Sequence, residues 1–163
     1  MPNRFDLLRP ETIQVLSDSG WDPQRKMDVS RWMEVFRQEG YAPSLRAEEV
    51  LSTLGGLSVE PVNKTGPYFS NDEPFSFDPI SCGNQRGMAL EIEQALGGRY
   101  FPIGEWLSYS SVFMEDGGAV VAAGLGWIWS MGSSFEEALE LAIYADRPLE
   151  CLYTDPGLNP WPR

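Results

Sequence analysis

The chain has no histidine, only two cysteines among its 163 residues, and half as many basic as acidic side chains, 12 against 24. Histidine is the commonest general base and a frequent metal ligand, so a chain without it lacks the usual carrier of both roles. Carboxylates or a thiolate could still support catalysis, but they would need activating neighbours at suitable spacing, and the sequence shows none. The composition therefore favours a protein that binds over an enzyme.

The chain also lacks a long apolar run. No window of about 18 uninterrupted apolar residues occurs, and residues 1–10 do not have the basic and then apolar order of an export signal. We therefore expect a cytoplasmic protein without membrane contact. In that compartment Cys82 and Cys151 are expected to be reduced, buried thiols, since the sequence has no CxxC motif and no second cysteine pair.

Cofactor and metal motifs are missing as well. Gly124-Leu125-Gly126 is not followed by the lysine and helix start of a phosphate loop, so it predicts a hairpin turn. No cysteine cluster suits zinc, and Glu115-Asp116 lacks the regular oxygen spacing of a calcium loop. Four carboxylate pairs are expected in turns or on solvent faces, where a solvated charge is the ordinary outcome: Glu48-Glu49, Glu91 with Glu93, Glu115-Asp116 and Glu136-Glu137. We expect no metal, no cofactor and no catalytic dyad.

The length fits one domain, and 42% hydrophobic with 12% aromatic residues is enough for a core. We expect a domain over residues 1–150 and a proline-rich tail over 151–163, because Pro156, Pro160 and Pro162 cannot continue a helix. The tail is expected either to pack back through Tyr153 or Trp161 or to fray.

Acidic charge is concentrated in the later part of the chain. Residues 1–64 carry ten acids and eight bases, whereas residues 65–163 carry fourteen acids and four bases. Such a field repels nucleic acid and anionic lipid, which both need Lys and Arg to neutralise phosphate. Two explanations remain open: general solubility, and a docking face for a basic partner.

Helical periodicity dominates the N-terminal third. We expect a helix over residues 11–19, which ends at Gly20, then one capped by Asp28 and one capped by Ser44. The apolar stripes of the last two predict core positions: Val29, Trp32, Met33 and Phe36, then Ala47, Val50, Leu51 and Leu54. Trp21 is expected in the core as well.

Extended segments then alternate with two further helices. Strands are expected at 57–59, 75–77, 100–103 and 127–129, with a turn-rich and mobile loop over 61–74. Asp116-Gly117 predicts a tight hairpin between 111–115 and 118–123. The helix over 88–96 should bury Met88, Ile92, Ala95 and Leu96, and a second helix should begin at Ser134, where Glu137 completes a capping box. The pattern predicts an α+β domain whose antiparallel or mixed sheet carries helices mainly on one side.

Five short motifs follow one another along the chain: Gly20-Trp21-Asp22-Pro23, Leu54-Gly55-Gly56-Leu57, Phe75-Ser76-Phe77-Asp78-Pro79, Phe101-Pro102-Ile103-Gly104-Glu105 and the segment from Gly132 to Leu139. Their order resembles the third family of the SUKH superfamily, the Smi1/Knr-like bacterial immunity proteins. The resemblance covers most of residues 10–146. It implies a small α+β protein that neutralises a polymorphic or contact-dependent toxin by binding it, and it supplies no catalytic residue.

Combining charge and resemblance, we expect a monomeric immunity protein that binds a basic, nuclease-type toxin through an acidic surface. The alternative is a cytosolic adaptor or regulatory scaffold of the Smi1-like type. Trp106 and Tyr109 are candidate anchors, because Trp106 is expected to be partly exposed beside an acid and aromatic residues are enriched at interface hot spots. The candidate acids are Glu91, Glu93, Glu105, Glu115, Asp116, Glu136, Glu137 and Glu140.

Overall fold

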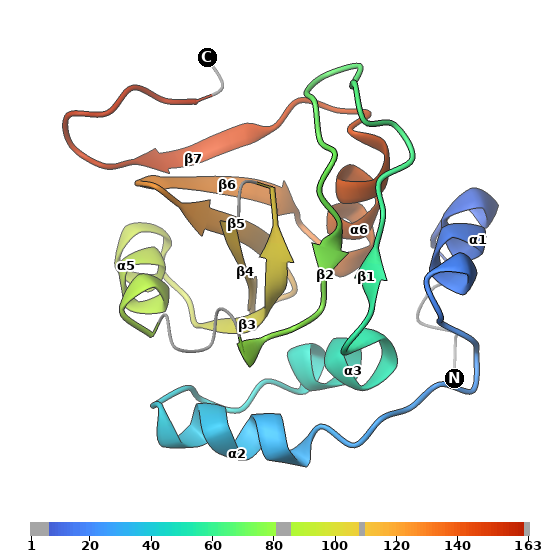
Figure 1. Ribbon diagram of the computed structural model, residues 1–163. Coiled ribbons are helices and arrows are strands. Elements are labelled where there is room, and N and C mark those ends of the chain that lie inside the picture. The colour runs from blue at the N-terminus through green and yellow to red at the C-terminus, as the bar shows by residue number, and fades with distance from the viewer. Residues whose placement is uncertain (1–6, 81–85, 108–109, 162–163) are drawn as a thin grey trace.

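The fold is a seven-stranded antiparallel sheet in which the strands follow one another in chain order (Figure 1). Figure 1 shows a computed structural model, in which residues 7–80, 86–107 and 110–161 are described. The strands are β1 (Ser58–Val59), β2 (Phe75–Ser76), β3 (Tyr100–Trp106), β4 (Ser110–Glu115), β5 (Val120–Gly124), β6 (Trp127–Gly132) and β7 (Glu150–Thr154). The α+β architecture expected from the sequence is confirmed.

Five helices are described: α1 (Pro10–Asp18), α2 (Ser30–Gln38), α3 (Leu45–Leu54), α5 (Arg86–Leu96) and α6 (Phe135–Tyr144). Figure 1 shows α5 on one side of the sheet and α3 and α6 on the other, with α2 lying below α3. The larger group buries a core against the sheet, in which Phe36 contacts Phe101 edge to face and Phe77 contacts Phe135. Within the described residues, every helix is too short or too polar to span a bilayer.

The capping residue of α3 is the predicted one, whereas that of α2 is not. The Ser44 hydroxyl accepts a hydrogen bond from Ala47 N at 3.2 Å, so the predicted cap of α3 is confirmed. The cap of α2 is Val29 and not Asp28, whose carboxylate instead accepts hydrogen bonds from the Ser30 hydroxyl and backbone N–H ahead of the helix. These bonds lower the pKa of Asp28.

The buried stripe of α5 is rotated from the predicted one. Ala89 and Ile92 are buried, Met88 is half-buried, and Ala95 and Leu96 are exposed. The last turn of α5 therefore extends past the sheet surface that its first two turns cover. The prediction was wrong there because periodicity gives the spacing of a stripe but not how far the partner surface reaches.

The loop over residues 61–74 is attached to the C-terminal end of α6. Backbone N–H groups of Val62 and Tyr68 donate to the carbonyls of Ile143 and Ala145, at 3.0 and 3.3 Å. The buried Asn71 side chain donates to the Ala142 carbonyl at 3.1 Å. The turn residues that predicted a mobile loop thus cap the end of a helix, where backbone carbonyls lack partners.

The tail contributes to the sheet and then folds back over it. β7 pairs with β6, so the expected boundary after Glu150 falls inside a strand. Beyond β7, the indole N–H of Trp127 donates to the Asn159 carbonyl at 2.8 Å, and that of Trp129 donates to the Trp161 carbonyl at 2.5 Å. The Trp161 ring packs edge to face on Trp129. The tail therefore packs back through Trp161, as one of the two sequence alternatives expected.

Candidate functional site

Five of the eight candidate acids make contacts within the protein. Glu140 shows this most clearly: its carboxylate accepts from the Thr12 hydroxyl at 2.6 Å and lies 3.4 Å from the Arg9 guanidinium, so it joins α6 to α1. Arg9 also pairs with Asp146 at 2.5 Å, a bond that raises its pKa, and stacks over the Tyr144 ring. With its side chain only 15% exposed, Glu140 has a structural role.

Glu137 stabilises the start of α6. Ser134 Oγ accepts from Glu137 N at 3.2 Å, as the capping box predicts. The Glu137 carboxylate reaches one residue further back than expected, accepting from Ser133 N at 2.9 Å and from the Ser133 hydroxyl at 3.0 Å. The backbone bond is the main cause of a lowered pKa for Glu137.

Glu93, Glu115 and Asp116 also have internal partners. The Glu93 carboxylate accepts from Tyr100 N at 3.0 Å and lies 3.5 Å from Arg86. Glu115 accepts from Gly117 N at 2.8 Å within its own turn, and Asp116 pairs with Arg99 at 2.9 Å. These contacts hold the β3, β4 and α5 ends together, which reduces the charge available to a partner.

The two aromatic anchors give different outcomes. Trp106, expected to be partly exposed, is 1% exposed and packs edge to face on Phe69. The end of β3 is covered by the 61–74 loop, which the sequence did not predict, so Trp106 belongs to the core. Tyr109 and Cys82 lie outside the described residues. Cys151 is half-buried instead of buried, and its Sγ lies 3.3 Å from the Tyr153 carbonyl oxygen.

The other three acids are placed on different elements. Glu91 is exposed on α5, Glu105 is half-buried on β3 beside Ser76 and Ser111, and Glu136 is half-buried in the first turn of α6. The partners of Glu115 and Glu137 are local, but those of Glu93, Asp116 and Glu140 lie 7 to 131 positions away, which the sequence could not predict.

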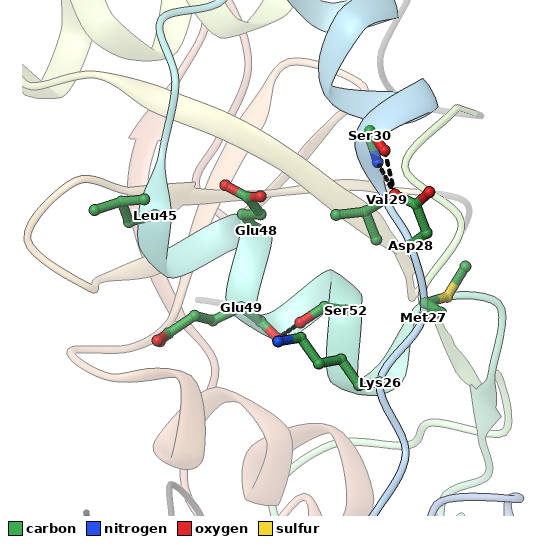
Figure 2. A pocket seen from close by; sticks show the side chains of 9 residues that line it. All are labelled: Lys26, Met27, Asp28, Val29, Ser30, Leu45, Glu48, Glu49 and Ser52. Carbon is green, nitrogen blue, oxygen red and sulfur yellow. Dashed lines mark hydrogen bonds between the residues drawn. The ribbon is translucent and has the colours of Figure 1, made fainter.

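An open groove of about 640 Å³ lies between residues 26–30 and α3 (Figure 2). Figure 2 shows Leu45 and Glu48 on the α3 wall and Val29 on the opposite wall. Leu45 is 80% exposed, and its neighbours in the lining include Asp28, Glu48 and Glu49 against a single base, Lys26. The sequence expected Glu48 and Glu49 on a solvent face, and did not single out the groove.

A second, smaller hollow of about 60 Å³ lies where α5, the β5–β6 turn and β7 meet. Leu125 at the tip of the turn is 75% exposed and Tyr153 on β7 is 37% exposed. Glu91 and Asp155 are the charged residues among those that line it. Both hollows combine acidic with apolar side chains, a mixture that also occurs in surfaces that contact other proteins.

The described residues contain no group of three or more Cys, Asp or Glu side chains that could hold a metal ion. The described residues form an α+β domain with two hollows that are lined by acidic and apolar side chains. A family model for the SUKH-3 immunity proteins matches residues 8–144, and the chain belongs to that family. No curated protein and no solved structure matches the chain. The family confirms the resemblance inferred from the sequence motifs.

Proposed function

We propose that this protein binds a cognate bacterial toxin with a basic, nuclease-type domain and neutralises it by occupying its surface. The family supports an immunity role. The protein acts in the cytoplasm as a monomer, and it inhibits by binding, with no reaction of its own. Its partner is a protein, with no nucleic acid or membrane involved.

The net charge of −12 carries this proposal. Nuclease domains are basic because they hold phosphate, so a strongly acidic inhibitor complements them. Long-range attraction between such surfaces raises the association rate towards about 10⁸ M⁻¹s⁻¹ at low salt, and a few apolar anchors then slow dissociation. Both acidic hollows, one at α3 and one at the β5–β6 turn, offer this combination of carboxylates with an exposed leucine.

Co-expression with the toxin encoded beside its gene tests the proposal. We expect survival of cells that produce both proteins, a 1:1 complex on size exclusion, and an association rate that falls steeply as salt is raised from 50 to about 300 mM. The control is the toxin with an empty vector, which should kill. Death despite soluble expression of this protein would overturn the proposal, and a salt-independent association rate would remove its electrostatic part.

A further inference from the structure

The turn between β5 and β6 has a backbone that its sequence does not favour. Gly124 pairs with Trp127, which leaves Leu125 and Gly126 as a two-residue loop with φ angles of +56° and +95°. Positive φ at both positions is the pattern of a type I′ turn, which prefers Asn or Asp at the first position and Gly at the second. A left-handed leucine costs about 1–2 kcal/mol, because its Cβ approaches the following carbonyl oxygen.

The side chain of Leu125 does not offset this cost. It is 75% exposed, so little of its apolar surface is removed from water when the chain folds. Leu125 therefore opposes the stability of the fold through both its backbone and its side chain. Residues that break local rules in this way are concentrated at functional sites, where a contact outside the fold compensates them.

The turn is held firmly by the tail beneath it. Asp155 N donates to the Gly126 carbonyl at 2.8 Å, and Leu158 N donates to the Asp155 carbonyl at 3.1 Å. Leu158 lies so close to Gly126 that a Cβ on that glycine would come within 2.5 Å of it. The backbone next to Leu125 is thus fixed before a partner binds, which lowers the entropy lost on binding.

The surroundings of Leu125 specify the chemistry of that partner. Tyr153 and Leu158, 37% and 42% exposed, add apolar surface on one side of the turn. Glu91 and Asp155, both exposed, give the adjoining hollow a negative charge. An apolar projection beside two carboxylates complements a surface that has an apolar recess next to Lys or Arg side chains.

We propose that Leu125, together with Tyr153, Leu158, Glu91 and Asp155, forms the surface that docks the basic toxin, with Leu125 inserted into an apolar recess on the toxin. This inference rests on the proposed immunity function and adds to it the place of contact. The α3 groove is the competing surface, but its exposed leucine, Leu45, sits in ordinary helical backbone and carries no such strain.

The test is the substitution Leu125→Asn, which separates binding from folding because the two should change in opposite directions. Asparagine tolerates the left-handed region, so we expect the melting temperature to rise by about 2–4 °C. Loss of the leucine anchor should weaken affinity for the catalytic domain of the neighbouring toxin at least about tenfold, measured by calorimetry. A destabilised fold cannot explain weaker binding by a protein that melts at a higher temperature.

Leu45→Ala is the matched control, since it removes a similarly exposed leucine from the competing groove, and it should leave the affinity unchanged. A second pair of variants addresses the charges. Glu91→Gln with Asp155→Asn should weaken binding and flatten its salt dependence, whereas Glu48→Gln should do neither.

The outcomes distinguish this inference from the proposed function. If the wild-type protein binds the toxin and Leu125→Asn binds equally well, the docking surface is wrong while the immunity role stands. Weaker binding by Leu45→Ala alone would transfer the site to the α3 groove and overturn the inference. If the wild-type protein fails to bind, both proposals are lost. A wild-type homodimer that Leu125→Asn dissociates would show that a second copy covers this surface, which would also contradict it.

Discussion

Both hairpins of the central sheet occur where the sequence predicts turns, but their loops differ in how well the residues suit the backbone. Asp116-Gly117, at the β4–β5 turn, has the residues that favour a two-residue turn, yet the chain uses a three-residue loop that includes Gly118 at φ +111°. Glu115 N donates to the Ala119 carbonyl and Gly118 N to the Glu115 carbonyl, at 2.7 and 2.9 Å. Leu125-Gly126, which lacks the preferred first residue, forms the tight turn.

The two turns differ in how well their residues suit the backbone conformation. At the β4–β5 turn, each residue suits its conformation, because the last glycine of a three-residue loop takes the positive φ angle. At the β5–β6 turn, the glycine suits its place and the leucine does not. Stability of the fold therefore accounts for the residues of the β4–β5 turn. It does not account for Leu125 in the β5–β6 turn.

The largest effect is expected from Gly126→Ala. The position has φ +95°, and the new Cβ would lie 2.5 Å from Leu158 Cδ1 and 3.1 Å from Asp155 Oδ2. We expect a loss of about 2–3 kcal/mol in unfolding free energy, measured by urea denaturation. A loss below about 0.5 kcal/mol would mean that the turn does not have this conformation.

Two substitutions in the β4–β5 turn should differ in the unfolding free energy that they cost. Gly118→Ala should cost about 1–2 kcal/mol because of its positive φ angle, although the nearest atom to a new Cβ is 3.5 Å away. Gly117→Ala should cost only about 0.5 kcal/mol, since its φ is ordinary and the crowding atom belongs to the Glu115 carboxylate, the end of a flexible side chain. Equal losses would favour the two-residue turn that the sequence predicted.

Trp161→Ala tests the support under the β5–β6 turn. The Trp161 ring lies 5.7 Å from Trp129 and 6.4 Å from Trp127, but is 45% exposed. We expect a loss of about 1 kcal/mol and a changed near-ultraviolet circular dichroism signal from the stacked Trp127 and Trp129 rings. Tyr68→Ala, at another exposed aromatic residue, is the control for the spectrum.

The smallest effect is expected at the start of α6, the helix that follows β6. Glu137→Gln should cost about 0.5 kcal/mol at pH 7, because the helix start and Ser133 favour the charged form. The pKa of Glu137 is lowered in the folded state, so its contribution is present above the ordinary value of 4.5 and is lost as pH falls below it. The two proteins should melt alike near pH 2, and a persisting gap would contradict this origin.

Much of the fold follows from local sequence. Ser44 and Ser134 cap helices as predicted, the stripe of α3 is buried, and the strands from β3 to β6 occur where alternation and turns place them. Long-range pairing was not predictable. β7 depends on its match to β6, and the 61–74 loop depends on free carbonyls at the end of α6, so neither has a periodic signal of its own.

The candidate surface was predictable only in its sign of charge. The sequence shows an excess of acids, but Glu140 and Glu93 are paired by residues from other elements, and Trp106 is buried by a loop distant in sequence. Leu125 did leave a signal: a leucine stands where a hairpin prefers Asn or Asp. Its importance emerges only once the backbone angle and the exposure are both known.

The strand order, in which each strand neighbours its predecessor, has a consequence for timing. Strands β4, β5 and β6 pair with their chain neighbours across short loops, and short loops favour fast pairing. Each new strand can join one already formed while the ribosome is still adding residues. For the proposed immunity role, such a topology would shorten the interval between synthesis and protection.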